Sequence, residues 1–376
     1  MAKGAYIGVS GTARKIKKGY IGVGSVARKI KKAYIGVGGV ARPCWSSVGL
    51  EYYGTLTALS VARVDLAATT VGNYALFGGG YTGSTNSDVI DAYNTSLTRS
   101  TPTALSVART KLAATTVGNY ALFGGGRSDA SSSGHLSTGD AYNASLTRST
   151  LTALSAVRAE LSATTVGNYA LFGGGYTGST YSNVVDAYNA SLTRSTPTAL
   201  SVARDELSAT TVGNYALFGG GRIKSTTISD VVDAYNTSLT RSIPTVLSTV
   251  RKRLDATTVG SYALFAGGYT SGYSAVVDAY NTSLTRSIPT ALSVARYYMG
   301  ATTLGNYALF GGGYKNKTTV DAYNTSLTRS TPTALSQYRA GLAATTVGNY
   351  ALFGGGDNSS PKYFSIVDAY AYYPES

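Results

Sequence analysis

AATTVGNYALFGGGYTGSTNSDVIDAY, residues 67–93, is the stretch from which the fold can be worked out, because close variants of it return six more times before the C-terminus. The Gly triplet in this stretch gives the count. The copies open their triplets 43 to 49 residues apart, at Gly78, Gly124, Gly173, Gly219, Ala266, Gly311 and Gly354. A period of this size is typical of a solenoid or a propeller.

Each unit has the pattern of four short strands. We expect strands over residues 67–71, 74–77, 89–93 and 97–106. The first has small and β-branched residues, which suit the crowded inner position of a wedge-shaped blade. Gly72-Asn73 predicts a two-residue hairpin turn in which both residues take positive backbone dihedrals. Pro102 must lie on a sheet edge, because proline cannot donate to the ladder. Four antiparallel strands with the proline-bearing strand outside describe a propeller blade.

The two ends of the array complete each other. The last unit stops after Tyr370 without a fourth strand, whereas residues 53–60, YGTLTALS, form a fourth strand with no unit before it. We therefore expect the segment just after Gly49 to pair with the C-terminal blade, because closure removes exposed sheet edges. The predicted fold is an all-β, seven-bladed propeller over residues 46–376.

Three recurring elements carry a family resemblance. YALFGGG, the VDAY strand about a dozen residues later and the SVAR before each inner strand resemble the Kelch repeat over residues 51–376. This resemblance implies a propeller with four antiparallel strands per blade. Kelch units usually place a tryptophan on the fourth strand. Here leucines stand at the comparable place: Leu97, Leu146, Leu192, Leu239, Leu284 and Leu327.

Residues 1–45 form a second repeat with a period of 14 residues. Each copy has a tyrosine-led apolar run, a Gly-rich turn and a basic run, which together predict a weak β-hairpin. The tyrosines and arginines of the three copies are Tyr6, Tyr20, Tyr34, Arg14, Arg28 and Arg42. So few apolar positions cannot bury a core, and we expect this segment to dock on other chains and to make the protein oligomeric. The segment over residues 1–45, with runs such as YIGVGSVARKIKK at residues 20–32, also resembles modules of phage-encoded or prophage-encoded structural proteins, which implies docking on other virion proteins.

The net charge of +14 is concentrated in this segment, with ten basic residues and no acidic residue before Glu51. An anion-binding patch for nucleic acid or a membrane surface is one interpretation of the RKIKK runs, and a solvated strand face that discourages wrong pairing is the other. We favour the second, because no aromatic stacking platform accompanies the charge.

A single cysteine excludes an intramolecular disulfide. The first ten residues have no signal-peptide pattern and no 18-residue apolar run occurs, so we expect neither membrane insertion nor export by that route.

Function is sought where the seven copies differ. The turns at residues 72–73 and 94–96 barely vary, whereas the pair after each SVAR arginine and the loop after each Gly triplet do. In a four-stranded blade both variable connections lie on one face, here called the variable face. Drift in unconstrained loops is the alternative, although the equally short turns opposite have not drifted. The predicted contact residues are Tyr81, Arg127, Tyr176, Tyr181, Asp205, Glu206, Arg222, Lys252, Arg253, Tyr269, Tyr273, Tyr297, Tyr298 and Tyr314. Tyrosine and arginine are amphipathic contact residues that stack on sugars or anchor protein interfaces.

A catalytic role is the weaker interpretation. Propellers resembling Kelch include a copper-dependent sugar oxidase and an isomerase of sialic acids, but His135 and Cys44 alone cannot form a copper site. We expect His135 to be exposed in its SSSGHLS loop. The SVAR arginine and the VDAY aspartate recur once per blade, which favours structural ion pairs over a catalytic role. These residues are Arg63, Arg109, Arg158, Arg204, Arg251, Arg296 and Arg339, with Asp91, Asp140, Asp186, Asp233, Asp278, Asp321 and Asp368. We expect Arg99 and its counterparts to charge the outer edge.

Three hypotheses about function follow. The first is a non-enzymatic structural protein of a bacteriophage virion or related extracellular particle, in the tail, a fibre or the head decoration, made in the cytoplasm. It would dock through residues 1–45 and display the variable face to a cell-surface glycan or protein, without catalytic residues, cofactor or metal. The second is an intracellular Kelch-type adaptor that binds protein through the same face. The third is a carbohydrate-active propeller enzyme.

Overall fold

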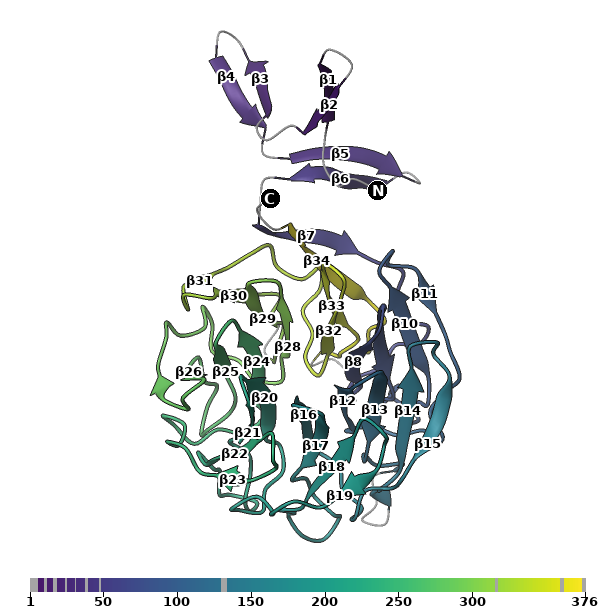
Figure 1. The fold of residues 1–376 in the computed structure, drawn as a ribbon, viewed down its shortest axis with the longest axis vertical. Coiled ribbons are helices and arrows are strands. Elements are labelled where there is room, and N and C mark those ends of the chain that lie inside the picture. Colours follow the sequence, from purple (N-terminus) through teal and green to yellow (C-terminus); the bar gives the residue numbers. More distant parts are fainter. Residues whose placement is uncertain are drawn as a thin grey trace.

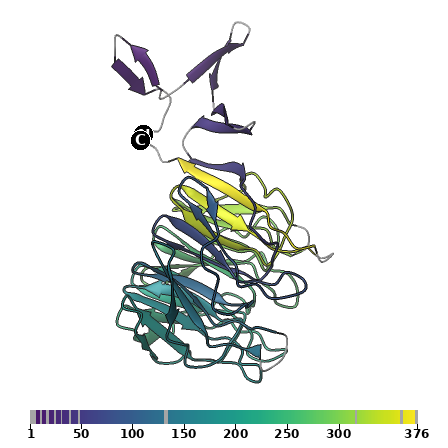
Figure 2. The ribbon, with the colours of Figure 1, turned by 90° about the vertical axis from the view of Figure 1, so that its right-hand side faces the viewer.

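The protein forms a closed ring of seven four-stranded antiparallel blades, seen face-on in Figure 1 and from the side in Figure 2. This computed structural model describes residues 49–129, 134–314, 317–358 and 362–373, and the backbone of six short strands nearer the N-terminus. The predicted all-β, seven-bladed propeller is confirmed. In the described part of the chain, no helix has the length and apolar character needed to cross a membrane.

The blades follow one another along the chain, and each runs from the central axis outward. The inner strands are β8 (Ala67–Val71), β12 (Ala113–Val117), β16 (Ser162–Val166), β20 (Ser208–Val212), β24 (Asp255–Val259), β28 (Gly300–Leu304) and β32 (Ala343–Val347). The second strands are β9 (Tyr74–Gly78), β13 (Tyr120–Gly124), β17 (Tyr169–Gly173), β21 (Tyr215–Gly219), β25 (Tyr262–Ala266), β29 (Tyr307–Gly311) and β33 (Tyr350–Gly354). The third strands are β10 (Ile90–Asn94), β14 (Gly139–Asn143), β18 (Val185–Asn189), β22 (Val232–Asn236), β26 (Val277–Asn281), β30 (Val320–Asn324) and β34 (Val367–Tyr373). The outer strands are β11 (Arg99–Ser100), β15 (Arg148–Leu151), β19 (Arg194–Ser195), β23 (Arg241–Ser242), β27 (Arg286–Ser287), β31 (Arg329–Ser330) and β7 (Gly49–Thr55).

The hydrophobic core is divided among the seven interfaces between neighbouring blades. Between blades 1 and 2, Leu76 and Ala92 of one blade pack with Phe123 and Tyr142 of the next, and all four are fully buried. The Phe123 and Tyr142 rings meet edge to face at 5.9 Å, a favourable arrangement for aromatic pairs. Each blade therefore depends on both neighbours for its buried surface.

The Gly triplet is required by this packing. A Cβ at Gly78 would lie 2.8 Å from Cε1 of Phe123 in the next blade. Gly79 has a φ of 68°, and a Cβ there would lie 2.6 Å from the carbonyl oxygen of Arg109. The triplet thus lets the next blade approach the backbone closely.

Replacing Gly79 with alanine should destabilise the propeller by about 2–4 kcal/mol, because a left-handed backbone conformation and a steric clash both oppose a side chain there. The midpoint of urea unfolding measures this effect. Gly272→Ala is the matched control, because nothing lies within 4 Å of a Cβ at that position. Equal midpoints for the two variants would contradict this account of the triplet.

Each blade contains a buried ion pair between its SVAR arginine and its VDAY aspartate, as the sequence predicted. In blade 1, Arg63 Nη2 lies 2.8 Å from Asp91 Oδ2, and both side chains are fully buried. The other six pairs repeat this arrangement. The expectation that Arg99 charges the outer edge was incomplete, because its Nη1 turns inward to Asp91 Oδ1 at 2.8 Å and its side chain is only 25% exposed.

The outer strands are shorter than the predicted ten residues, and proline explains the difference. β11 ends at Ser100, two residues before Pro102, so the prolines lie beyond the strands and not within them. Blade 2 has Leu151 at the equivalent position, and there β15 continues to Leu151, which pairs with Gly139. Leucine supplies the N–H group that proline lacks, so the ladder runs two residues further.

The turns on the face opposite the variable face differ from the prediction in one respect. Gly72 has a positive φ of 53°, whereas Asn73 does not. In the next turn Leu97 has a φ of 62°, and the Asn94 side chain accepts hydrogen bonds from the backbone N–H groups of Ser96 and Thr98 at 3.0 and 2.9 Å. The asparagine side chain stabilises this turn in place of the glycine that such a backbone usually requires.

The ring closes between its first and last strands. β7 pairs antiparallel with β34 from Thr55 opposite Asp368 to Gly49 opposite Tyr373. The pairing strand is Gly49–Thr55, which begins earlier than the predicted fourth strand at residues 53–60, and the N–H groups of Leu56 and Leu59 still donate to the carbonyls of Val367 and Ser365. The Tyr52 hydroxyl donates to Asp368 Oδ1 at 2.6 Å, and so occupies the place that an outer arginine has in the other blades.

The N-terminal segment pairs its strands as three antiparallel hairpins, which Figure 1 draws outside the disc beyond β7. The hairpins join β1 (Tyr6–Val9) to β2 (Thr12–Lys15), β3 (Gly19–Val23) to β4 (Val26–Ile30), and β5 (Lys32–Val37) to β6 (Val40–Ser46). One hairpin thus corresponds to one 14-residue copy. The side chains of the predicted docking residues Tyr6, Tyr20, Tyr34, Arg14, Arg28 and Arg42 lie outside what the structure describes.

Candidate functional site

The two variable connections of each blade lie side by side on one face of the disc. In blade 1, Val64 of the pair after Arg63 forms a β-bridge with Tyr81 of the loop after the Gly triplet, and Tyr81 also bridges to Asn86. The same double bridge recurs in blades 2, 3, 4, 5 and 7. In blade 6 the N–H of Tyr314 donates to the carbonyl of Tyr297 at 2.9 Å. All variable positions therefore contribute to one surface.

The second residue of each variable pair belongs to a ring around the central axis, here called the inner ring. Its members are Asp65, Lys111, Glu160, Glu206, Arg253, Tyr298 and Gly341, and each has a φ between 51° and 62°. Each backbone N–H donates to the carbonyl oxygen of the preceding member, at 2.9 to 3.2 Å. Because every blade supplies one member, this circle of seven hydrogen bonds closes only when all the blades are present.

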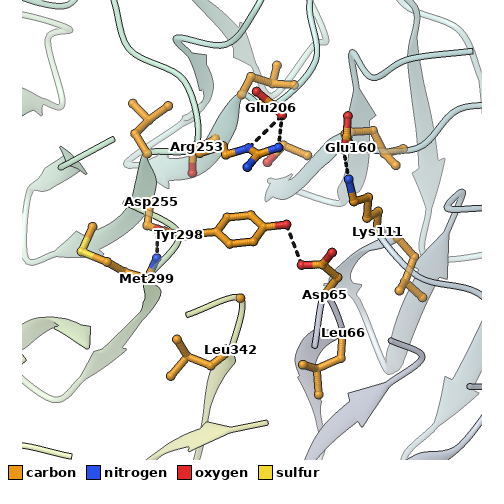
Figure 3. A pocket seen from close by; sticks show the side chains of 17 residues that line it. Asp65, Leu66, Lys111, Glu160, Glu206, Arg253, Asp255, Tyr298, Met299 and Leu342 are labelled. Carbon is orange, nitrogen blue, oxygen red and sulfur yellow. Dashed lines mark hydrogen bonds and ion pairs between the residues drawn. The ribbon is translucent and has the colours of Figure 1, made fainter. Parts of the chain in front are cut away.

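Side chains of the inner ring cross the mouth of the central channel, as Figure 3 shows. Tyr298 passes over Gly341 and donates its hydroxyl hydrogen to Asp65 Oδ1 at 2.5 Å. A Cβ at Gly341 would lie 3.2 Å from both Tyr298 Cε1 and Asp65 Oδ1, so glycine leaves room for this contact. Burial raises the pKa of Tyr298 well above its ordinary value, so the hydroxyl remains protonated and able to donate.

Five of the six charged residues predicted on this face form one network at blades 4 and 5. Arg222 makes a two-pronged contact with Asp205, at 3.0 Å from Nε and 2.6 Å from Nη2. Arg253 and Lys252 both pair with Glu206, at 2.6 and 3.0 Å. These five predicted contact residues are thus paired with one another, and the carboxylates of Asp205 and Glu206 are buried.

Beside this network, predicted tyrosines form an aromatic platform at blades 5 and 6. Tyr297 lies at its centre, with the Tyr314 ring stacked at 5.0 Å and 9° and the Tyr273 ring stacked at 5.4 Å and 14°. Tyr269 packs edge-on against Tyr297 at 5.6 Å. Tyr298 joins the platform to the inner ring, and the Arg253 guanidinium lies 5.1 Å from its ring centre. The platform is half-buried, so part of each ring remains accessible.

The remaining predicted contact residues lie away from the platform. Tyr81 packs edge to face on Tyr363 at 5.8 Å. Tyr176 and Tyr181 lie 5.3 Å apart in blade 3, and Arg222 lies over Tyr181 at 5.7 Å. Arg127 forms bridges to Thr110 and His135 through its backbone.

Sequence reasoning missed several residues of this face. Asp65, Lys111 and Glu160 were recognised as variable but were not assigned to the site. The expectation that His135 is exposed was wrong, because the residue is 8% exposed and its ring packs on Tyr176 at 5.7 Å. Asp255 was also missed. The sequence signal for Asp255 is its place as the first residue of an inner strand, because this position is Ala, Gly or Ser in the other six blades.

Threonine hydroxyls line the channel nearer the opposite face. Thr116 donates to the carbonyl of Thr70, Thr70 donates to that of Thr346 at 2.7 Å, and Thr346 donates to that of Thr303 at 3.2 Å. The inner strands of the other blades extend this belt around the axis. These hydroxyl groups donate to backbone carbonyls of neighbouring blades. The residue types that differ from blade to blade lie on the variable face.

In the described part of the chain, no group of three or more His, Cys, Asp or Glu residues is arranged to hold a metal ion. No protein-family model matches the sequence, and neither does any curated protein. Among solved structures, one titled "Structure of YjhT" resembles this chain with a TM-score of 0.55 and 13% sequence identity, over 84% of this chain and 96% of that chain. The likeness to YjhT is one of fold, and it supports a seven-bladed β-propeller.

Proposed function

We propose that this protein is a non-enzymatic recognition module whose variable face binds cell-surface glycans. The aromatic platform of Tyr273, Tyr297 and Tyr314 is the observation that carries this proposal. Its rings are nearly parallel and half-buried, and the Arg253 guanidinium lies 5.1 Å from the ring centre of the adjoining Tyr298. Aromatic rings present apolar area and hydroxyl groups together at a low cost in conformational entropy, which suits sugars with both C–H faces and hydroxyls.

The platform differs from the other tyrosines in its role in the fold. Tyr93 and its counterparts on the third strands are fully buried and donate to backbone carbonyls, so the blades account for them. Tyr297 lies at a position where no other blade has an aromatic residue, and its partner Tyr314 lies at a position that is tyrosine in blades 1, 3, 5 and 6. A structural requirement would recur in every blade, whereas a binding site needs to be built once.

The wider setting that we propose is a bacteriophage virion or related particle. The chain enters the propeller through β7, which is the outermost strand of its blade. A segment anchored at the rim leaves the variable face clear, so residues 1–45 can dock on a particle while the propeller faces a host surface. The resemblance of residues 20–32 to phage structural modules and of the repeats to Kelch units supports this arrangement.

Replacing Tyr297 with alanine should weaken glycan binding about 5- to 30-fold, which corresponds to losing about 1–2 kcal/mol of aromatic contact. A glycan array identifies the ligand, and calorimetry on the best sugar gives the affinities of wild type and variant. Tyr120→Ala is the control, because Tyr120 starts β13 beside a turn on the opposite face. This variant should bind as the wild type does.

The alternatives predict different results in the same experiments. An intracellular adaptor would bind a protein and no glycan, with the Tyr297 ring as an anchor at the centre of the interface. A carbohydrate-active enzyme would turn over a sugar of the panel. The virion assignment can be tested by low-resolution imaging of purified particles that have been incubated with an antibody against the propeller. Particles that bind no antibody would contradict the assignment.

A further inference from the structure

A cavity of about 250 Å³ lies beneath the inner ring, and the inner-strand residues in its wall are polar on one side only. Ser162, Ser208 and Asp255 open the inner strands of three successive blades, and all three line the cavity. The equivalent residues of the other four blades are Ala67, Ala113, Gly300 and Ala343. The rest of the wall combines the charged and polar side chains of the inner ring with six leucines and Met299. The inner strands of blades 3 to 5 therefore begin with a polar residue, whereas those of the other four blades begin with alanine or glycine.

Asp255 is the most unusual member of this wall. Its Oδ2 accepts a hydrogen bond from the Met299 N–H at 2.9 Å, as Figure 3 shows. Among the residues that the structure describes, no basic side chain lies within ion-pair distance of its carboxylate. Burial raises the pKa of Asp255 to about 7. A desolvated carboxyl group without a charged partner is unfavourable in the fold, and such groups are common at binding sites.

Four carboxyl groups and two cationic side chains line the cavity. Lys111 pairs with Glu160, and Arg253 shares Glu206 with Lys252, so both cations of the wall already have carboxylate partners. Asp65 receives a hydrogen bond from Tyr298 but has no cationic side chain within ion-pair distance in the described part of the chain. Two carboxyl groups, those of Asp65 and Asp255, therefore remain without a positive partner.

We infer that this central cavity binds a small hydroxylated primary amine, with its ammonium group on Asp255 and its hydroxyl groups on Ser162 and Ser208. An ammonium group donates up to three hydrogen bonds and supplies the missing positive charge. The carbon skeleton would pack on the leucines and Met299 of the wall. At about 30 Å³ per water-sized group, the cavity holds roughly eight non-hydrogen atoms. This site differs from the stacked rings of Tyr273, Tyr297 and Tyr314, which do not line the cavity, although Tyr298 and Arg253 adjoin both.

The test compares two probes of equal size, 2-amino-1,3-propanediol and glycerol. The first has an ammonium group on its central carbon, where glycerol has a hydroxyl group. Calorimetry on the full-length chain should give at least about tenfold tighter binding for the amine. Asp255→Ser should reduce amine binding at least about tenfold and leave glycerol binding unchanged. The variant should fold, because blades 3 and 4 have serine at the same position.

Asp88→Ser is the matched control, since it removes the same charge from an exposed position of the same face. It should bind the amine as the wild type does. The inference is overturned if the wild type gives no binding heat with the amine at about 50 mM. It is also overturned if glycerol binds as tightly as the amine, or if Asp255→Ser binds the amine unchanged while thermal unfolding shows an intact fold.

Discussion

Replacing Asp91 with alanine should lower the free energy of unfolding by about 3–5 kcal/mol, because it leaves a buried arginine without its counter-ion. Arg63 is fully buried, and its Nη2 contacts Asp91 Oδ2 at 2.8 Å and the Phe77 carbonyl at 3.1 Å. The backbone N–H of Ser60 also donates to Asp91 Oδ1 at 3.0 Å. One carboxylate therefore satisfies groups from three parts of blade 1.

Arg99→Ala is the control for this prediction. Arg99 binds the same carboxylate, but its side chain is 25% exposed, so water can replace it. We expect a loss of no more than about 1 kcal/mol, the usual range for exposed pairs. Urea unfolding followed by circular dichroism measures both variants. If the two losses were equal, the buried pair would not be the dominant contact of the blade.

The blade count and the buried ion pairs could be predicted because each signal occurs seven times. A single Arg and Asp 28 residues apart carry no information, but recurrence in every unit favours a shared structural cause. The length of the outer strands depended on one residue per blade. Proline in five blades and Leu151 in blade 2 mark where the ladder ends, but only the observed pairing reveals this relation.

The inner ring could not be predicted from residue types. All seven members adopt a backbone conformation that glycine favours, but only Gly341 has the residue type that signals it. The conformation is imposed by hydrogen bonds between blades, which are contacts between residues far apart in sequence. The tyrosine platform was predicted as a set of contact residues. The stacking of Tyr297 between Tyr273 and Tyr314 depends on how blades 5 and 6 meet.

Deleting residues 1–55 should destabilise the propeller by about 5 kcal/mol or more, because it removes the outer strand of blade 7. Leu50 and Tyr52 pack on the core between blades 6 and 7, and Tyr53 meets Tyr350 edge to face at 5.1 Å. Each buried side chain of this size contributes about 1.5–3 kcal/mol. The deletion also exposes the edge of β34, which invites pairing between molecules.

Deleting only residues 1–45 is the matched control, because it retains β7 and the Tyr52 contact with Asp368. This shorter truncation should unfold at the midpoint of the full-length chain, whereas the longer one should unfold earlier and aggregate. A synthetic peptide of residues 46–60 should restore the midpoint of the longer truncation in a concentration-dependent way, since binding only the folded state stabilises it. Equal midpoints for the two truncations would mean that the circle of inner-ring hydrogen bonds and the core hold seven blades together without this closing strand.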